Sequence, residues 1–346
     1  MNPKLKSMRA LWLRCFPEDN EALVNHFYAY YGHPCHHLTI EEGDEVIAML
    51  HHIDTYQYVF FDKPFRTSYI YAACTAPEHQ GKGLMSQLIV RTLHLLHEKR
   101  IPLCVTIPAS ESLFQYYGRF GFVPAFKRGC QRWDKEPLPD QPLDEMHLFD
   151  NGMDKMLQIW LGDCINKRKS GHLWHTQRDL QCALEANRLT GGFNAVLLDE
   201  HEKLAAAAVV ECTDFALRVR DLVCSQPASY QNLCYLLSQA TSLPVWIDTL
   251  PSSGDPYFGA ARIVNMPRLL RAFAHDSRIK AEEVFYIKDD LILENNGLYR
   301  MTGNCCHFKP CPVPPEESAS IKVYDIAEYS RKLFSIEPGY MTLMMD

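Results

Sequence analysis

The sequence predicts an α/β (α+β) protein with mixed sheets, in which two α/β domains in tandem precede a smaller α+β domain. Three observations lead to this fold class. Residues 69–91 read as a strand, a glycine-containing loop and an amphipathic helix in direct succession. A similar order of helices and strands returns between residues 156 and 249. Two segments without periodicity, the proline-rich and acidic 135–154 and the turn-rich 251–256, separate the three parts.

The first domain is expected to begin with two helices and a hairpin. Apolar residues such as Leu11, Trp12 and Phe27 recur on one side of the helices, and Pro17–Asn20 supplies the turn between them. Residues 41–45 have turn chemistry between two short strands. In chain order, we expect helices within residues 5–31, strands at 36–40 and 46–50, a strand at 69–75, a helix from 84 to 96 and a strand at 103–107.

The second domain repeats this order but lacks a glycine loop. Its expected elements are helices at 156–161 and 180–189, hairpin strands at 193–198 and 204–211, a strand at 217–224, a helix at 230–240 and a strand at 245–249. Ser225–Ala228 stands where the loop would be, so we interpret this domain as a degenerate repeat that binds no cofactor. The third domain is expected to contain a short helix at 263–273, a β-ribbon at 285–300 and a helix at 321–334.

Composition and charge narrow the function classes. A hydrophobic content of 47% is enough for sizeable cores, and no apolar run reaches the roughly 18 residues of a transmembrane helix, so we expect no membrane partner. The net charge of −7 argues against nucleic-acid binding and suits a cationic small substrate. The 13 scattered cysteines, an odd number, favour free thiols in a reducing cytoplasm.

The loop after the strand at 69–75 has the chemistry of a diphosphate site. Gly81 and Gly83 allow the backbone to approach a ligand and to point several N–H groups in one direction. The helix that follows directs the positive end of its dipole to the same place. Lys82 adds a mobile positive charge.

The spacing Gln80-Gly81-Lys82-Gly83-Leu84-Met85 resembles the Gln/Arg-x-x-Gly-x-Gly/Ala signature of the GNAT acetyltransferase superfamily, with Met85 in place of the usual small last residue. Residues 108–122, a short tyrosine-bearing helix that ends in Arg-Phe-Gly-Phe, resemble the last characteristic block of that family. This resemblance covers roughly residues 1–130.

The whole chain resembles the Eis-like acetyltransferases. That resemblance implies a catalytic GNAT domain over residues 1–135, a degenerate GNAT-like domain over 136–255 and a sterol-carrier-protein-like domain with a C-terminal tail over 256–346. It also implies an acetyl-CoA-dependent N-acetyltransferase that acts on a primary amine of a small molecule or of an exposed lysine.

The family resemblance assigns roles to residues of the first domain. Ala73, through its main-chain N–H, would stabilise the developing oxyanion, and Tyr117 would be the general acid, with Tyr116 as the spare candidate. The residues expected to contact acetyl-CoA are Ala73, Cys74, Thr75, Gln80, Gly81, Lys82, Gly83, Leu84, Met85, Ser86, Ser110 and Tyr116. Glu111 would lie on the same side.

An alkylammonium substrate must lose a proton before it can attack. In the Eis-like family the C-terminal carboxylate reaches the active site, and in this chain that carboxylate would belong to Asp346. Pro338 and Gly339 are expected to turn the chain out of the preceding helix, and the residues that follow them are apolar. The sequence leaves other bases open, namely Glu41, Glu42, His51, His52 and Asp54.

Two rival functions stay open at this point. The chain could be a binding protein that holds an apolar ligand in its third domain, or a tandem acyltransferase that uses another donor. We expect no metal, because the spacing of Cys305, Cys306, His307 and Cys311 fits no usual zinc site. We leave open whether the chain forms a homo-oligomer.

Overall fold

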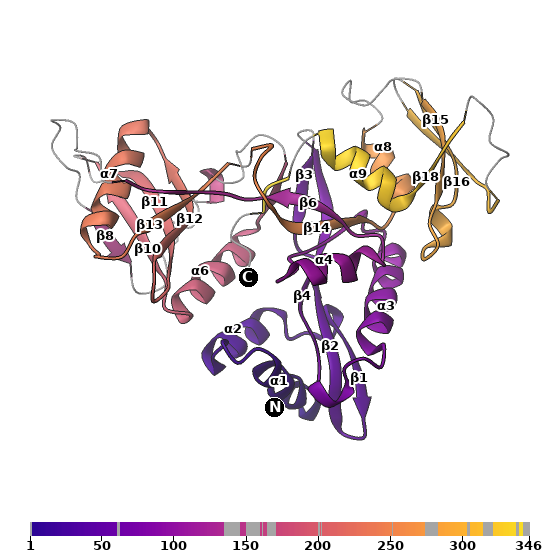
Figure 1. Cartoon of the computed structure of the whole chain (residues 1–346), viewed down its shortest axis with the longest axis horizontal. Helices are drawn as coiled ribbons and strands as arrows, with labels where there is room; N and C mark the ends of the chain where they lie inside the picture. Colours follow the sequence, from indigo (N-terminus) through magenta and orange to yellow (C-terminus); the bar gives the residue numbers. More distant parts are fainter. Residues whose placement is uncertain are drawn as a thin grey trace.

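The computed structural model describes residues 2–60, 63–134, 146–149, 160, 162–164, 171–199, 201, 203–250, 252–273, 283–302, 305–313, 321–336 and 339–341. These residues form an eight-stranded, a six-stranded and a four-stranded sheet with helices packed against them (Figure 1). The two larger sheets pair strands in both parallel and antiparallel fashion. The predicted α/β (α+β) class with mixed sheets is therefore confirmed.

The first sheet carries the N-terminal part of the chain, with the strand order β1-β2-β4-β5-β14-β6; β3 pairs with β4, and β9 pairs with β3. Its strands are β1 (His37–Glu42), β2 (Glu45–Ile53), β3 (Gln57–Phe60), β4 (Lys63–Thr75), β5 (Leu103–Thr106), β6 (Val123–Lys127), β9 (His172–Trp174) and β14 (Tyr257–Ile263). Helices α1 (Pro3–Cys15) and α2 (Glu21–Tyr31) cover one face, α3 (Leu84–Glu98) covers the other, and α4 (Glu111–Gly118) follows β5.

The alternating directions of side chains along each strand explain why the two faces of the sheet pack against different helices. Met49 of β2 packs into the core that contains Trp12 of α1, whereas its neighbours Ala48 and Leu50 pack against α3. Successive side chains of a strand point to opposite faces of the sheet. Strand β4 therefore contacts α1 on one face and α3 on the other.

The second sheet has the order β7-β13-β12-β11-β10-β8. It consists of β7 (Gly129–Arg132), β8 (Met146–Phe149), β10 (Phe193–Leu198), β11 (Leu204–Cys212), β12 (Leu217–Cys224) and β13 (Val245–Thr249), with helices α6 (Gln177–Leu189) and α7 (Pro227–Gln239). Helix α6 also contacts α2, where the hydroxyl of Tyr31 donates a 2.7 Å hydrogen bond to Asp179. This contact joins the cores of the first two sheets.

The third sheet, of order β17-β16-β15-β18, lies at the far end of the molecule from the second sheet, and α9 contacts both this sheet and strands β6 and β14 of the first sheet (Figure 1). Its elements are α8 (Met266–Phe273), β15 (Glu283–Lys288), β16 (Gly297–Thr302), β17 (Cys305–Pro310), β18 (Lys322–Asp325) and α9 (Ile326–Ile336). No described helix has both the length and the apolarity needed to cross a membrane.

Two strands cross between the three parts of the chain. Strand β7 leaves the first part and pairs with β13 in the second sheet, and β14 returns to lie between β5 and β6 in the first sheet. The predicted domain limits at 135/136 and 255/256 stay a prediction, and the first of them lies outside the described residues.

Most predicted elements are present, with a few differences. The strands predicted at 193–198, 217–224 and 245–249 are confirmed as β10, β12 and β13. The helix predicted at 321–334 is wrong at its start, because residues 322–325 form β18. Asp325 then caps α9, since its Oδ1 accepts a 2.7 Å hydrogen bond from the N–H of Glu328. The helix predicted at 156–161 lies outside the described residues except at Trp160.

Candidate active site

Strand β4 carries a backbone irregularity beside which a cavity opens. Strand β2 pairs with β4 as far as Ala48 opposite Thr75, and its register shifts near Ala72, whose φ is +45°. A positive φ is uncommon for a residue other than glycine and is concentrated at functional sites. On the other side, the register with β5 ends at the pair Ile70 and Thr106. The edge of β4 beyond Ile70 therefore extends past its parallel neighbour.

The glycine loop leaves the N-terminus of α3 open. Gly81 and Gly83 both have φ of +77°, a conformation that glycine adopts at little cost. Gly83 occupies the N-cap position of α3, and no side chain caps this end of the helix. A Cβ at either glycine would meet no atom within 4 Å. The first N–H groups of α3 are thus available to an anion.

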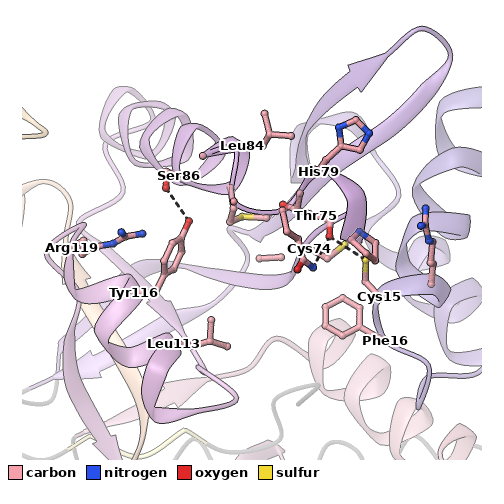
Figure 2. Close-up of a pocket in the computed structure, with 17 residues that line it drawn as sticks. Cys15, Phe16, Cys74, Thr75, His79, Leu84, Ser86, Leu113, Tyr116 and Arg119 are labelled. Carbon is pink, nitrogen blue, oxygen red and sulfur yellow. Dashed lines mark hydrogen bonds between the residues drawn. The ribbon is translucent and has the colours of Figure 1, made fainter.

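A cavity of about 760 Å³ lies between this loop, β4, α4 and the end of α1 (Figure 2). Ten of the residues predicted to contact acetyl-CoA line it: Ala73, Cys74, Thr75, Gln80, Gly81, Gly83, Leu84, Met85, Ser86 and Tyr116. The edge of β4 and the open end of α3 therefore border one cavity.

A second cavity, of about 460 Å³, shares Phe16, Ala73 and Leu113 with the first. Its walls include aromatic rings of α1 and β4, and Tyr117 lies in it as well. Glu18 and Asp19 add two carboxylates. Ala73, the residue predicted to hold the oxyanion, thus lies where the two cavities meet.

Three predicted site residues are not placed in either cavity. Lys82 is exposed, and its Nζ lies 3.3 Å from Nδ1 of His79. Ser110 is the N-cap of α4, where its hydroxyl accepts from the N–H of Leu113. Asp346 lies outside the described residues. The roles predicted for these three residues stay predictions.

The two tyrosines of α4 point to different surroundings. Tyr117 is buried, and burial raises its pKa to about 12, although a hydrogen bond with Thr106 acts in the opposite direction. Tyr116 lines the larger cavity, and its hydroxyl lies 3.1 Å from the Oγ of Ser86 on α3. Tyr117 therefore remains a protonated phenol at neutral pH, and Tyr116 fastens α4 to α3.

The C-terminal end of α1 contributes residues that sequence reasoning missed. Cys15 lines the larger cavity with its Sγ 3.7 Å from the carbonyl oxygen of Thr75. A hydrogen bond from Cys74, assisted by the charge of Arg14, lowers the pKa of the Cys15 thiol, against the effect of burial. No local sequence signal marks this contact, because it depends on how α1 packs across β4.

Asp19 is another residue that the sequence did not assign to the site. It follows α1, and its Oδ2 accepts a 2.6 Å hydrogen bond from the indole N–H of Trp12. Burial raises the pKa of Asp19 above its ordinary value, and this hydrogen bond acts against the rise. Asn20 caps α2, since its Oδ1 accepts from the N–H of Leu23 at 2.9 Å. The carboxylate of Asp19 therefore does not cap α2, and Asp19 lines the second cavity.

The alternative bases left open by the sequence lie elsewhere. Neither cavity is lined by Glu41, Glu42, His51, His52 or Asp54. His51 is fully buried, and burial lowers its pKa to about 3. The carboxylate of Asp54 lies 2.8 Å from Nδ1 of His52 and 2.7 Å from Nζ of Lys99. Both contacts to Asp54 lie away from the two cavities.

Comparison with known proteins identifies the part of the chain that holds both cavities. Residues 3–125 match the family model of an acetyltransferase (GNAT) domain, and every residue that lines either cavity falls within this range. No curated protein matches the sequence significantly.

Solved structures resemble nearly the whole chain. One is a conserved protein of unknown function from Enterococcus faecalis, described as a probable N-acyltransferase, with 15% identity, a TM-score of 0.74 and coverage of 94% of this chain and 86% of that one. A GCN5-related N-acetyltransferase from Anabaena variabilis has 17% identity, a TM-score of 0.72 and coverage of 99% and 97%. Eis1 from Mycobacterium abscessus has 14% identity, a TM-score of 0.67 and coverage of 97% and 88%. At these identities the likeness establishes the fold, and the GNAT domain supports an acyltransferase.

Proposed function

We propose that the protein is an N-acetyltransferase that transfers the acetyl group of acetyl-CoA to a primary amine. The observation that carries this proposal is that the open N-terminus of α3 and the free edge of β4 border one cavity, which joins a second cavity at Ala73. A diphosphate fits the N–H groups from Gly81 to Ser86. A pantetheine arm can pair with the edge from Ala73 to Thr75 as an added strand would.

When bound, acetyl-CoA supplies an acetyl thioester, and the chain supplies charge stabilisation and proton transfer. The N–H of Ala73 donates to the oxygen that becomes negative, a contribution of about 3 kcal/mol in other enzymes. The hydroxyl of Tyr117, in the adjoining cavity, gives its proton to the leaving thiolate. Burial keeps this phenol protonated at neutral pH.

The acceptor belongs in the second cavity and is a cationic amine, either of a small molecule or of an exposed lysine side chain. Glu18 and Asp19 supply two negative charges at this cavity, and the rings of Trp12, Phe16 and Tyr69 supply π faces. Carboxylates and aromatic faces both attract ammonium groups.

The base that deprotonates this ammonium is the terminal carboxylate of Asp346 in the Eis-like arrangement. The positions of Gly339 and Tyr340 support this assignment, because these residues pair with β6 and β9 of the first sheet. Asp19 is a second candidate, since it lies in the acceptor cavity and burial raises its pKa toward the range of a useful base.

The Eis-like domain organisation is part of the same proposal. Residues 1–135 carry the chemistry, 136–255 are a GNAT-like domain without a cofactor site, and 256–346 are a sterol-carrier-protein-like domain. The solved structure of Eis1, which matches 97% of this chain in fold, supports this arrangement.

The test has two stages. Calorimetry should show acetyl-CoA binding with one molecule per chain, and absence of binding would refute the proposed function. A thiol-release assay with paired cationic and neutral amines should then favour the cationic ones. Asp19→Asn and Glu18→Gln should raise the KM for cationic amines while the KM for acetyl-CoA stays unchanged. Equal rates for cationic and neutral amines would remove the acceptor assignment and leave acetyl-CoA binding standing.

A further inference from the structure

Arg119 occupies a distinctive place in the larger cavity. It follows α4, and its guanidinium carbon lies 4.6 Å from the ring centre of Tyr116. The hydroxyl of Tyr116 in turn lies within hydrogen-bond distance, 3.1 Å, of the Oγ of Ser86 near the start of α3. Figure 2 shows Arg119, Tyr116 and Ser86 together on one side of the cavity, with Cys15 and His79 on the other. The guanidinium is thus positioned by its stack on Tyr116, whose ring is in turn fixed by a hydrogen bond to α3, in the wall of the larger cavity.

No carboxylate among the described residues compensates the charge of Arg119. Within the part of the chain that the structure describes, no ion pair involves Arg119. The other arginine of this cavity, Arg14, donates two hydrogen bonds to Glu78, at 2.9 and 2.6 Å, so its charge is neutralised. Lys82 does not line the cavity. Arg119 is therefore the lining cation best able to take a further anion.

Coenzyme A carries two separate anionic groups. Its diphosphate suits the N–H groups at the start of α3, as proposed above. The phosphate on the 3′ oxygen of its ribose is a monoester with a charge of about −1.5 to −2 at pH 7, which the helix end cannot satisfy at the same time. An arginine fork matches such a phosphate, with two parallel hydrogen bonds.

We infer that Arg119 binds the ribose 3′-phosphate of coenzyme A and makes the site prefer this donor to one that lacks that phosphate. The inference rests on the proposed function, because it assumes that the larger cavity takes acetyl-CoA. It adds a specificity for the donor that the glycine loop cannot provide, since the loop would bind the diphosphate of either ligand equally. The planar guanidinium is already held on Tyr116, so little side-chain freedom is lost on binding.

The test compares acetyl-CoA with acetyl-3′-dephospho-CoA by calorimetry, on the wild-type chain, Arg119→Gln and Arg119→Lys. Wild type should bind the 3′-phosphorylated ligand about tenfold to a hundredfold more tightly, as expected for a hydrogen bond to a charged group. Arg119→Gln should lose this preference and keep its affinity for the dephospho ligand, which also shows that the variant is folded. Arg119→Lys should recover part of the preference.

A matched control is Arg91→Gln, on the exposed side of α3 and outside both cavities, which should bind both ligands as wild type does. Equal weakening of both ligands in Arg119→Gln would overturn the inference, because it would place the guanidinium on the diphosphate. Equal affinity of wild type for the two ligands would overturn it as well, with the proposed function intact. Failure of wild type to bind either ligand would overturn both.

Discussion

The main-chain N–H of Lys127, at the end of β6, donates a 3.0 Å hydrogen bond to the carbonyl oxygen of Gly339. The N–H of Gly339 donates in return to the carbonyl oxygen of Ala125 at 3.1 Å, and Leu173 of β9 donates to Tyr340. Met341 is buried. A segment that follows the third sheet thus pairs with the GNAT domain, although more than 200 residues separate the two along the chain.

Gly339 is expected to be irreplaceable for packing. A Cβ there would lie 2.6 Å from Cδ1 of Phe126 and 2.7 Å from the hydroxyl of Tyr58, both on strands of the first sheet. Gly339→Ala should lower the free energy of unfolding by about 1–3 kcal/mol, as overpacking does. Urea denaturation measures this loss. Gly254→Ala, where a Cβ meets no atom within 4 Å, is the control and should leave stability nearly unchanged.

Removal of residues 342–346 should suppress turnover at neutral pH and spare acetyl-CoA affinity. The proposed base would be lost, and an alkylammonium with a pKa near 10 would then react only through its small neutral fraction. Turnover should recover partly as the pH rises toward 10, because that fraction grows. Steady-state rates across this range test the expectation. If the truncated chain turns over normally and Asp19→Asn does not, the base is Asp19.

Gly83→Asp should abolish measurable acetyl-CoA binding, a loss of at least a hundredfold in affinity. The substitution places a side chain and a negative charge where the diphosphate would lie, and φ of +77° adds strain. Gly191→Asp is a matched control, because Gly191 also has positive φ and an open surrounding but follows α6. Both variants should lose similar stability, while only Gly83→Asp loses binding in calorimetry. Normal binding by Gly83→Asp would refute the loop assignment.

Tyr117→Phe should lower kcat about a hundredfold or more and leave acetyl-CoA affinity unchanged, because the ring remains and only the proton donor is removed. The pH profile carries a further expectation. A phenol with a pKa of about 12 stays protonated below that pH, so Tyr117 should cause no alkaline loss of kcat between pH 7 and 10. Tyr116→Phe is the paired control and should weaken acetyl-CoA binding with a smaller effect on kcat. The opposite pattern would exchange the two roles.

Cys15 should react with iodoacetamide faster than an ordinary thiol, and acetyl-CoA should protect it. The hydrogen bond from Cys74 lowers the pKa of Cys15, so more thiolate is present at neutral pH. Peptide mapping by mass spectrometry gives the rate at each cysteine, with the exposed Cys35 as the reference. Cys74→Ala should slow the reaction of Cys15. Labelling of Cys15 that acetyl-CoA does not slow would place the ligand elsewhere.

The candidate site was predictable where its geometry is local. The glycine loop, the helix after it and the tyrosines of α4 follow from turn chemistry and helical periodicity within short segments. The cavity contains ten predicted contact residues for that reason. Cys15, Asp19 and Arg14 could not be found in the same way, because their place depends on the packing of α1 across β4.

The sequence by itself determined the order of the helices and strands around the glycine loop and the loop with its open helix end, while the reading of the second domain as a degenerate repeat stays a prediction. Side-chain alternation, capping residues and glycine at positive φ act over a few residues and can be read directly from the chain. Only the tertiary structure decided that β7 enters the second sheet, that β14 enters the first, and that Gly339 returns to β6. Strand partners are chosen by hydrogen bonds and apolar burial between distant segments, and a strand has the same pattern whichever neighbour it takes.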